Sequence, residues 1–187
     1  MVKLLLKKEL VKIPKECEVT QKGKVFTFKG PLGKQTYDAS AFKFTFILDG
    51  DVIEIQSWHG NRRKNNYVNT VASHLRNNAN GVVTGFRYVA KALYKHFSIQ
   101  LIVDKSAKEI IIKNYYGKKQ GKHFPIIGET TVEIGEDKCS LIVEGINLEH
   151  VSQTICNLEN WTKKEKLYDP RIFLDGIFVV ERGVKVC

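Results

Sequence analysis

The segment KNYYGKKQGKH, residues 113–123, combines residue types that bind phosphate. It holds four lysines, two tyrosines and two glycines, and it has no acid. Lysine supplies a positive point charge, and glycine lets the backbone approach an oxyanion closely. Two kinds of phosphate fit such a loop: those of a nucleotide and those of a nucleic-acid backbone.

The spacing of the glycines argues against a nucleotide-binding P-loop. That motif needs a glycine, four residues, a second glycine, a lysine, and then serine or threonine for magnesium. Here three residues separate Gly117 from Gly121, and His123 follows Lys122. The segment also follows a predicted strand and leads to no predicted helix, so we do not expect it to bind a nucleotide.

We interpret the same loop as a contact with the backbone of a nucleic acid. In this interpretation Lys118, Lys119 and Lys122 supply positive charge to phosphates. Tyr115 and Tyr116 are available to stack on bases or pack against sugars. The alternative is a solvated basic turn without a ligand.

The charge of the whole chain also favours a polyanionic partner. Thirty lysines and arginines against twenty acids give a net charge of +10. No acid occurs between Glu54 and Asp104, a stretch of 49 residues in which the average composition predicts about five. The bases of this stretch are Arg62, Arg63, Lys64, Arg76, Arg87, Lys91 and Lys95.

The segment WHGNRRKNN, residues 58–66, places cations where a helix begins. Asn61 is a suitable N-cap, so Arg62, Arg63 and Lys64 fall in the first helical turn. Cations there oppose the helix dipole, at a typical cost of ~0.3–1 kcal/mol each. A phosphate facing the helix start removes this conflict, whereas a solvated charged turn is the alternative.

The sequence excludes several other classes of function. No histidine has a cysteine or aspartate partner at catalytic spacing, and no cysteine pair has the spacing of a zinc site. No apolar run approaches the roughly 20 residues of a membrane span, and the N-terminal apolar stretch is too short for a secretory signal. We therefore expect a cytosolic or nuclear protein that is not an enzyme, with no cofactor, no metal, no small-molecule substrate and no membrane contact.

The first half of the chain reads as short strands followed by one helix. Alternating residues predict hairpins over 17–30 and 42–58, with turns at Lys22-Gly23 and Asp49-Gly50. Apolar residues at helical spacing then predict a helix from Asn61 that ends at Gly81.

The second half repeats this order. Hairpins are predicted over 99–114 and 130–145, and a helix follows with Asn147 as its cap. Asn61 and Asn147 are 86 residues apart, and the loops 28–35 and 112–120 match at a shift of 84 residues.

This internal repeat predicts a duplication. We expect the α+β class, with two duplicated domains at 1–82 and 83–187, each a small antiparallel β-sheet packed against one α-helix. The segment 85–96 suits a strand or a helix by its spacing, and we favour a strand because Phe86, Tyr88 and Val89 are strand formers.

The segment DPRIFLDGIFVV, residues 169–180, closes the second repeat. Pro170 stops the last helix before it, Asp175-Gly176 makes a tight turn, and a strand that pairs with the second sheet follows. Arg171 is then expected at the surface with few internal partners, where its guanidinium suits bidentate contact with phosphate.

Several strings in order resemble one known family: VKIP, FKGPLGK, WHGNRRK, GVVTGFRY, YKHFSI and DPRIFLDGIFVVERG. The family is the large-subunit ribosomal protein known as protein six in bacteria and protein nine in eukaryotes, and the eukaryotic type is the more similar. The resemblance implies a non-catalytic protein with two duplicated α+β domains. It also implies binding to large-subunit ribosomal RNA near the stalk base and the sarcin–ricin loop.

The resemblance extends to partners, location and individual residues. It implies neighbouring ribosomal proteins, the cytosolic ribosome with nucleolar assembly, and a second domain that supplies much of the RNA contact. Ile172 and Phe178 depart from the lysine and tyrosine usual in the family, and the loop of Lys118, Lys119 and Lys122 matches only loosely. The residues expected to face RNA by this resemblance are Arg62, Arg63, Lys64, Arg87, Tyr88, Arg171, Asp175 and Gly176.

Two other functions stay open at this point. One is a free-standing RNA-binding ribosome maturation factor, and the other is an RNA-processing enzyme. A ribosomal protein stays with large subunits in a high-salt wash, whereas a factor or an enzyme is released.

Overall fold

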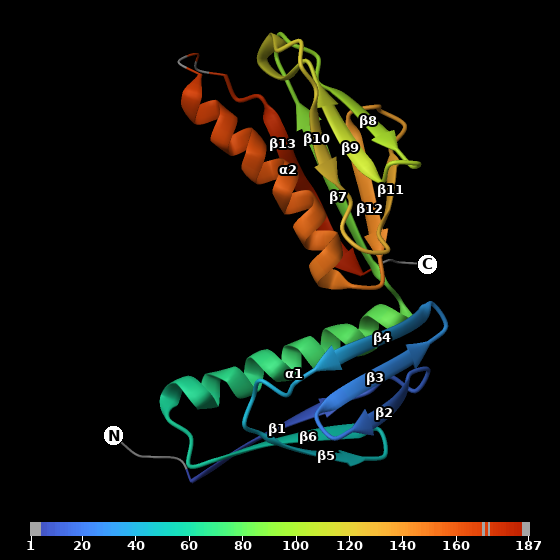
Figure 1. Ribbon diagram of the computed structural model, residues 1–187, viewed down its shortest axis with the longest axis vertical. Helices are drawn as coiled ribbons and strands as arrows, with labels where there is room; N and C mark the ends of the chain where they lie inside the picture. Colours follow the sequence, from blue (N-terminus) through green and yellow to red (C-terminus); the bar gives the residue numbers. More distant parts are fainter. Residues whose placement is uncertain (1–4, 170, 172, 185–187) are drawn as a thin grey trace. The chain divides into compact units, whose positions relative to one another are not determined.

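The chain divides between Gly85 and Phe86 into two units that share one plan. The computed structural model describes residues 5–169, 171 and 173–184. In each unit six short strands precede one long helix (Figure 1). The expected α+β class with a repeated arrangement is therefore confirmed.

The first unit contains two three-stranded antiparallel sheets. One has the order β1-β6-β5 and the other the order β2-β3-β4. Its elements are β1 (Leu6–Lys12), β2 (Glu18–Lys22), β3 (Val25–Gly30), β4 (Gly33–Asp38), β5 (Thr45–Asp49), β6 (Val52–Trp58) and α1 (Arg62–Val83).

The second unit repeats these orders as β7-β12-β11 and β8-β9-β10, and β13 adds a fourth strand beside β7. Its elements are β7 (Phe86–Leu93), β8 (Gln100–Asp104), β9 (Glu109–Lys113), η1 (Tyr115–Gly117), β10 (Lys122–Pro125), β11 (Thr131–Ile134), β12 (Ser140–Gly145), α2 (Leu148–Tyr168) and β13 (Gly176–Val184). Each unit thus has two sheets where one was expected, because the second to fourth strands pair among themselves and leave the first strand to pair with the sixth.

The predicted hairpins form where the turn residues placed them. Gly23 and Gly50 have φ of 64° and 55°, values that glycine adopts without strain. The segment from Phe86 is a strand, as expected, and the predicted pairing of the last strand with the second sheet is also confirmed.

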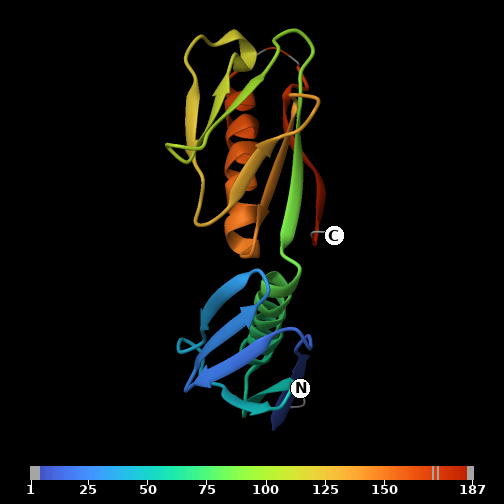
Figure 2. The ribbon, with the colours of Figure 1, turned by 90° about the vertical axis from the view of Figure 1, so that its right-hand side faces the viewer.

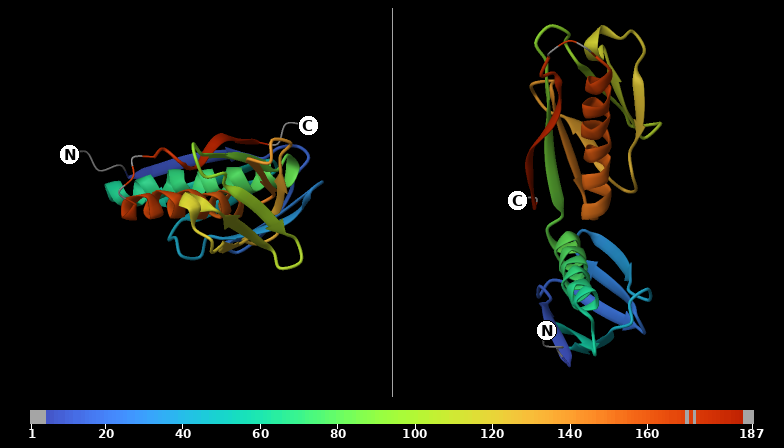
Figure 3. Two further views of the ribbon diagram at one scale, coloured as in Figure 1. Left: turned by 90° about the horizontal axis from the view of Figure 1, so that it is seen from above. Right: turned by 90° about the vertical axis from the view of Figure 1, so that its left-hand side faces the viewer.

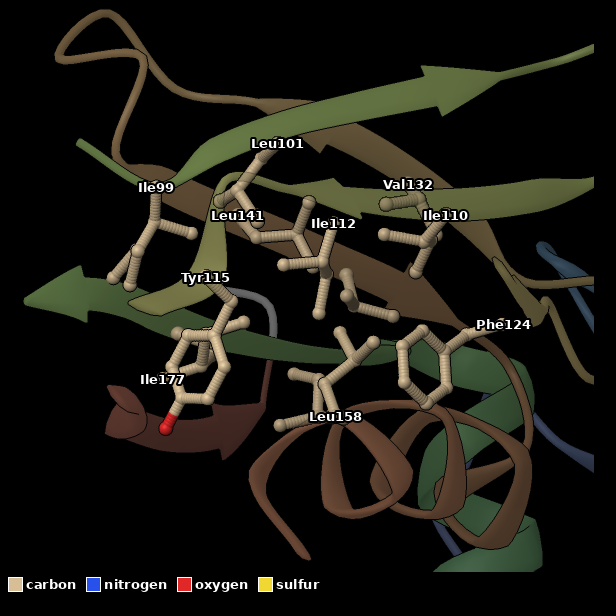
Figure 4. Close-up of a cluster of buried hydrophobic side chains, with 14 of the residues drawn as sticks. Ile99, Leu101, Ile110, Ile112, Tyr115, Phe124, Val132, Leu141, Leu158 and Ile177 are labelled. Carbon is tan, nitrogen blue, oxygen red and sulfur yellow. The ribbon is translucent and has the colours of Figure 1, made fainter. Parts of the chain in front are cut away.

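One side of each helix packs against the sheets of its own unit (Figures 2 and 3). In the first unit the buried residues of α1 follow helical spacing: Val68, Val71, Ala72, Leu75, Ala79 and Val82. In the second unit Leu158 of α2 lies among apolar side chains from both sheets, beside Ile112 and Phe124 (Figure 4). The hydrophobic effect on these stripes holds each helix in place.

The end of α1 differs from the prediction. Gly81 is buried inside the helix, which continues to Val83, so a boundary between 82 and 83 falls within it. The amide of Gly85 donates to the carbonyl of Gly81 at 3.1 Å, and Gly85 has φ of 72°. Gly85, and not Gly81, is therefore the left-handed residue that ends the helix.

Gly30 lies where the turn between β3 and β4 meets the end of α1. The amide of Leu32 donates to the carbonyl oxygen of Val82 at 3.1 Å. A Cβ at Gly30 would lie 2.5 Å from that same oxygen, which is closer than real Cβ contacts. The close approach of the two backbones therefore depends on glycine at this position.

We expect Gly30→Ala to destabilise the first unit by about 1–3 kcal/mol, because the turn or the helix must shift to admit the methyl group. Calorimetric unfolding of the full chain measures the effect. Gly183→Ala is the matched control, since its Cβ would meet nothing within 4 Å. Equal unfolding of the two variants would show that the contact with Val82 is unimportant.

Candidate nucleic-acid interface

The start of α1 exposes three cations together. Arg62, Arg63 and Lys64 lie in its first turn, and all three are exposed. No acid accompanies them in that turn, and none of their side chains has an ion pair within the described part of the chain. The expected concentration of positive charge at a helix N-terminus is therefore present.

The loop before α1 leads into the helix without a side-chain hydrogen bond that caps its first turn. Asn61 occupies the N-cap position, yet its side chain makes no capping hydrogen bond. His59 has φ of 48°, and its amide donates to the carbonyl of Leu5 at 2.9 Å. The free amides of the first turn are thus left to a ligand or to water.

Arg87 and Tyr88 lie on opposite faces of β7. Arg87 is exposed, and its Nε lies 3.7 Å from a carboxylate oxygen of Glu144 on the neighbouring strand β12. Tyr88 is half-buried and packs against the hydrophobic core of the second unit. Successive side chains of a strand alternate, so the two residues do not form one surface. A contact of either residue with RNA stays a prediction.

The two tyrosines of the basic loop belong to the core. Tyr115 is 2% exposed and Tyr116 is 5% exposed. Contrary to the expectation, neither ring is available to stack on a nucleic acid. The Tyr115 hydroxyl donates to the carbonyl of Thr162 at 3.0 Å, and its ring points into the core (Figure 4). Burial raises the pKa of Tyr115 and keeps the phenol neutral.

The lysines of this loop are not equivalent. Lys118 forms an ion pair with Glu165 of α2, whereas Lys119 and Lys122 are exposed and make no ion pair within the described residues. The Glu165 carboxylate holds the loop against α2. Lys118 is thus an exposed cation with an acid beside it, whereas Lys119 and Lys122 are exposed cations without one in the described part of the chain.

Arg171 has many internal partners, contrary to the expectation. Its Nε and one Nη donate to the Asp169 carboxylate at 2.9 and 2.5 Å, and the same Nη donates to the carbonyl of Tyr116 at 3.2 Å. The guanidinium also lies 5.4 to 5.5 Å from the ring centres of Phe97, Tyr116 and Phe173. Arg171 therefore joins three segments of the second unit.

Asp175 and Gly176 are buried, so the expectation that they face RNA is wrong. Asp175 is 4% exposed, and one carboxylate oxygen accepts a hydrogen bond from the amide of Lys95 at 3.1 Å. Gly176 is the first residue of β13 and pairs with Leu93. Both residues anchor β13 beside β7. Positions 170 and 172 lie outside the described residues.

The structure brings the basic loop and the final motif together. Arg171 bonds to Tyr116, and the Tyr115 hydroxyl lies 3.3 Å from the carbonyl oxygen of Asp175. This junction is held by Phe97, Phe173 and Asp169, which were not predicted from the sequence. The one clue in the sequence is that Asp169 and Arg171 carry opposite charges two positions apart, a spacing that allows an ion pair.

The described residues contain no group of three or more His, Cys, Asp or Glu side chains arranged to hold a metal ion. Within the same residues, neither helix is long and apolar enough to span a bilayer.

Archaeal ribosomal proteins resemble the chain over most of its length. Large ribosomal subunit protein uL6 of Staphylothermus marinus is 39% identical over 188 residues, which cover 98% of each chain. Proteins of the same name from Desulfurococcus amylolyticus and Saccharolobus solfataricus are each 36% identical; the first alignment covers 94% of each chain, and the second covers 98% of this chain and 99% of the relative. No protein-family model matches the chain.

These relatives are archaeal, so they do not support the expected eukaryotic type or the nucleolar assembly that it implies.

The cations of the first turn of α1 lead to a test that separates stability from binding. We expect Arg63→Gln and Lys64→Gln each to stabilise the free protein by ~0.3–1 kcal/mol, because each removes a charge that opposes the helix dipole. Both should weaken RNA binding. Denaturant unfolding and RNA titration measure the two effects. Arg76→Gln, beyond the first turn, should give no such stabilisation, and a loss of stability in the first-turn variants would contradict the dipole argument.

The pair of Asp169 and Arg171 leads to a dependence of stability on pH. The hydrogen bonds from Arg171 lower the pKa of Asp169 from 3.8 to about 2. Because the pKa is lower in the folded state, the ionised carboxylate of Asp169 stabilises the fold, and this stabilisation is complete above the ordinary pKa of 3.8. It is lost as the pH falls toward about 2. The difference in melting temperature between the unmodified chain and Asp169→Asn should therefore shrink between about pH 4 and pH 2.

We also expect Arg171→Ala to lower the melting temperature, in contrast to the sequence-based expectation of a surface residue with few internal partners. Arg171→Lys should lower the melting temperature less than Arg171→Ala does, because lysine keeps the positive charge but lacks the planar guanidinium. For the pH prediction above, the contradicting outcome is a difference in melting temperature between Asp169→Asn and the unmodified chain that stays constant with pH. It would show that the ion pair does not stabilise the fold.

Proposed function

Since the chain belongs to the uL6 family of large ribosomal subunit proteins, we propose that it is a structural constituent of that subunit and binds its ribosomal RNA. The observation that carries the proposal is the length of the similarity, which spans 94 to 98% of the chain in the relatives named above. The role is architectural and not enzymatic. The place of action is the cytoplasmic ribosome.

The electrostatics of the chain support contact with RNA phosphates. The net charge is +10, and the exposed cations at the start of α1 have no internal acid in the first turn. Neutralising phosphates with such groups releases counterions, which makes binding strong at low salt and weaker at high salt. Helical RNA presents its backbone and a shallow minor groove, so the contacts should read shape more than sequence.

We propose that the exposed cations contact RNA directly and that the buried or paired residues position them. Arg62, Arg63 and Lys64 form one group in the first unit, and Lys119 and Lys122 form another in the second. Lys118, Arg171, Asp175 and Gly176 act indirectly, because they hold the basic loop and β13 in place.

The finer location follows from the family resemblance. We propose that the chain lies near the base of the stalk and the sarcin–ricin loop, in contact with neighbouring proteins of the large subunit, and that the unit from Phe86 supplies part of that contact. The exposed Lys119 and Lys122 in this unit support the assignment.

We expect the full-length chain to remain with large subunits when they are washed in high salt and sedimented. Contacts with many phosphates and with neighbouring proteins at once make release slow, although each single contact is weakened by salt. Large subunits assembled without the chain should show raised chemical reactivity of the RNA near the stalk base and the sarcin–ricin loop.

Release of the chain in the high-salt wash would point instead to a free-standing maturation factor. Retention with unchanged RNA reactivity in those two regions would keep the ribosomal role and refute the location.

A further inference from the structure

The surplus of positive charge is unequal between the two units. Residues 1–85 hold 14 lysines and arginines and 7 acids, a net charge of +7, whereas residues 86–187 hold 16 and 13, a net charge of +3. Most of the surplus therefore lies in the first unit. The second unit also pairs many of its bases with acids: Arg87 with Glu144, Lys91 with Asp137, Lys118 with Glu165, Lys163 with Glu159, and Arg171 with Asp169.

Helix α1 carries an exposed polar row that runs from its first residue, Arg62, to Arg76. None of its 22 residues is an acid, and four are lysine or arginine. The row, which we call the α1 outer face, repeats every three or four residues and so lies on one side of the helix. It consists of Arg62, Asn66, Asn69, Ser73 and Arg76, all exposed and opposite the buried stripe that packs on the sheets.

The side chains of this row are free to bind a ligand. Those of Arg62, Asn66, Asn69 and Arg76 form no hydrogen bond or ion pair within the described part of the chain. The Ser73 hydroxyl donates to the carbonyl of Asn69 at 2.9 Å and keeps its lone pairs available. Asparagine is a poor helix former, so its frequent use in α1 is not explained by helix stability.

We propose that the α1 outer face docks on double-helical RNA, so that the first unit has an RNA-binding surface of its own. The inference rests on the proposed function and names the RNA form that this surface takes. Arg76 comes 14 positions after Arg62, which is about 21 Å along a helix axis. The two guanidiniums bind phosphates at the ends of the row, and the amides and the hydroxyl between them bind ribose 2′-hydroxyls in the wide, shallow minor groove.

The order of side chains along the row favours RNA over an acidic protein. An acidic partner helix presents carboxylates at regular intervals, and it would need cations in the middle of the row as well as at its ends. Here Asn66, Asn69 and Ser73 occupy the middle. Amides and hydroxyls both donate and accept hydrogen bonds, as ribose hydroxyls do.

The first test places a negative charge in the middle of the row. Full-length Asn69→Glu should bind a blunt RNA duplex of mixed sequence about tenfold more weakly, because its carboxylate would face phosphates. Asn160→Glu is the matched control, since Asn160 is also an exposed asparagine inside a helix, in the second unit. It carries the same change of net charge and should alter the affinity much less.

A second variant tests the two ends without adding an acid. The double variant Arg62→Gln with Arg76→Gln should reduce the slope of log affinity against log salt by about 2, one for each lost phosphate contact. Unfolding curves of all variants check that each remains folded.

Equal effects of Asn69→Glu and Asn160→Glu, or no binding of the duplex by the unmodified chain, would overturn this inference. Either result leaves the proposed function standing if the chain still sediments with washed large subunits. Binding to polyglutamate that Asn69→Glu abolishes, with RNA binding unchanged, would show an acidic protein as the partner and would also overturn it.

Discussion

In each unit one helix covers two small sheets, and the rest of the structure depends on this packing. Helix α1 contacts β1, β3, β4 and β6, and α2 contacts β7, β10, β12 and β13. The first, fourth and sixth strands of each repeat thus meet the helix in the same way. The inward stripe of each helix must stay apolar to close the core over these sheets, so the outward side is the part that is free to differ between the repeats.

The two helices differ on that outward side, although they occupy equivalent places. Helix α2 follows the usual rules of stability, since the side chain of Asn147 caps its first turn and Glu149 lies near its N-terminus. Helix α1 follows neither rule, because its cap makes no side-chain bond and its first turn is cationic. Where a helix departs from local rules while its duplicate obeys them, the departure indicates selection for binding.

Features set by neighbouring residues could be predicted from the sequence, and features set by distant residues could not. The turns at Gly23 and Gly50 and the cap at Asn147 are local, so their patterns placed the strands and the helix correctly. The basic surroundings of Tyr115 suggested a surface position. It is buried by residues that are distant in sequence, such as Trp161 on α2, whose ring centre lies 5.1 Å from that of Tyr115 although the two residues are 46 positions apart.

The pairing of β13 with β7 has a consequence for synthesis on the ribosome. These are the last and the first strands of the second unit, so its four-stranded sheet cannot close until residues up to Val184 have left the exit tunnel. All strands of the first unit pair with one another before Gly85. The nascent chain can therefore complete the sheets of the first unit before the four-stranded sheet of the second unit can close. During this interval one edge of β7 is left without its partner strand.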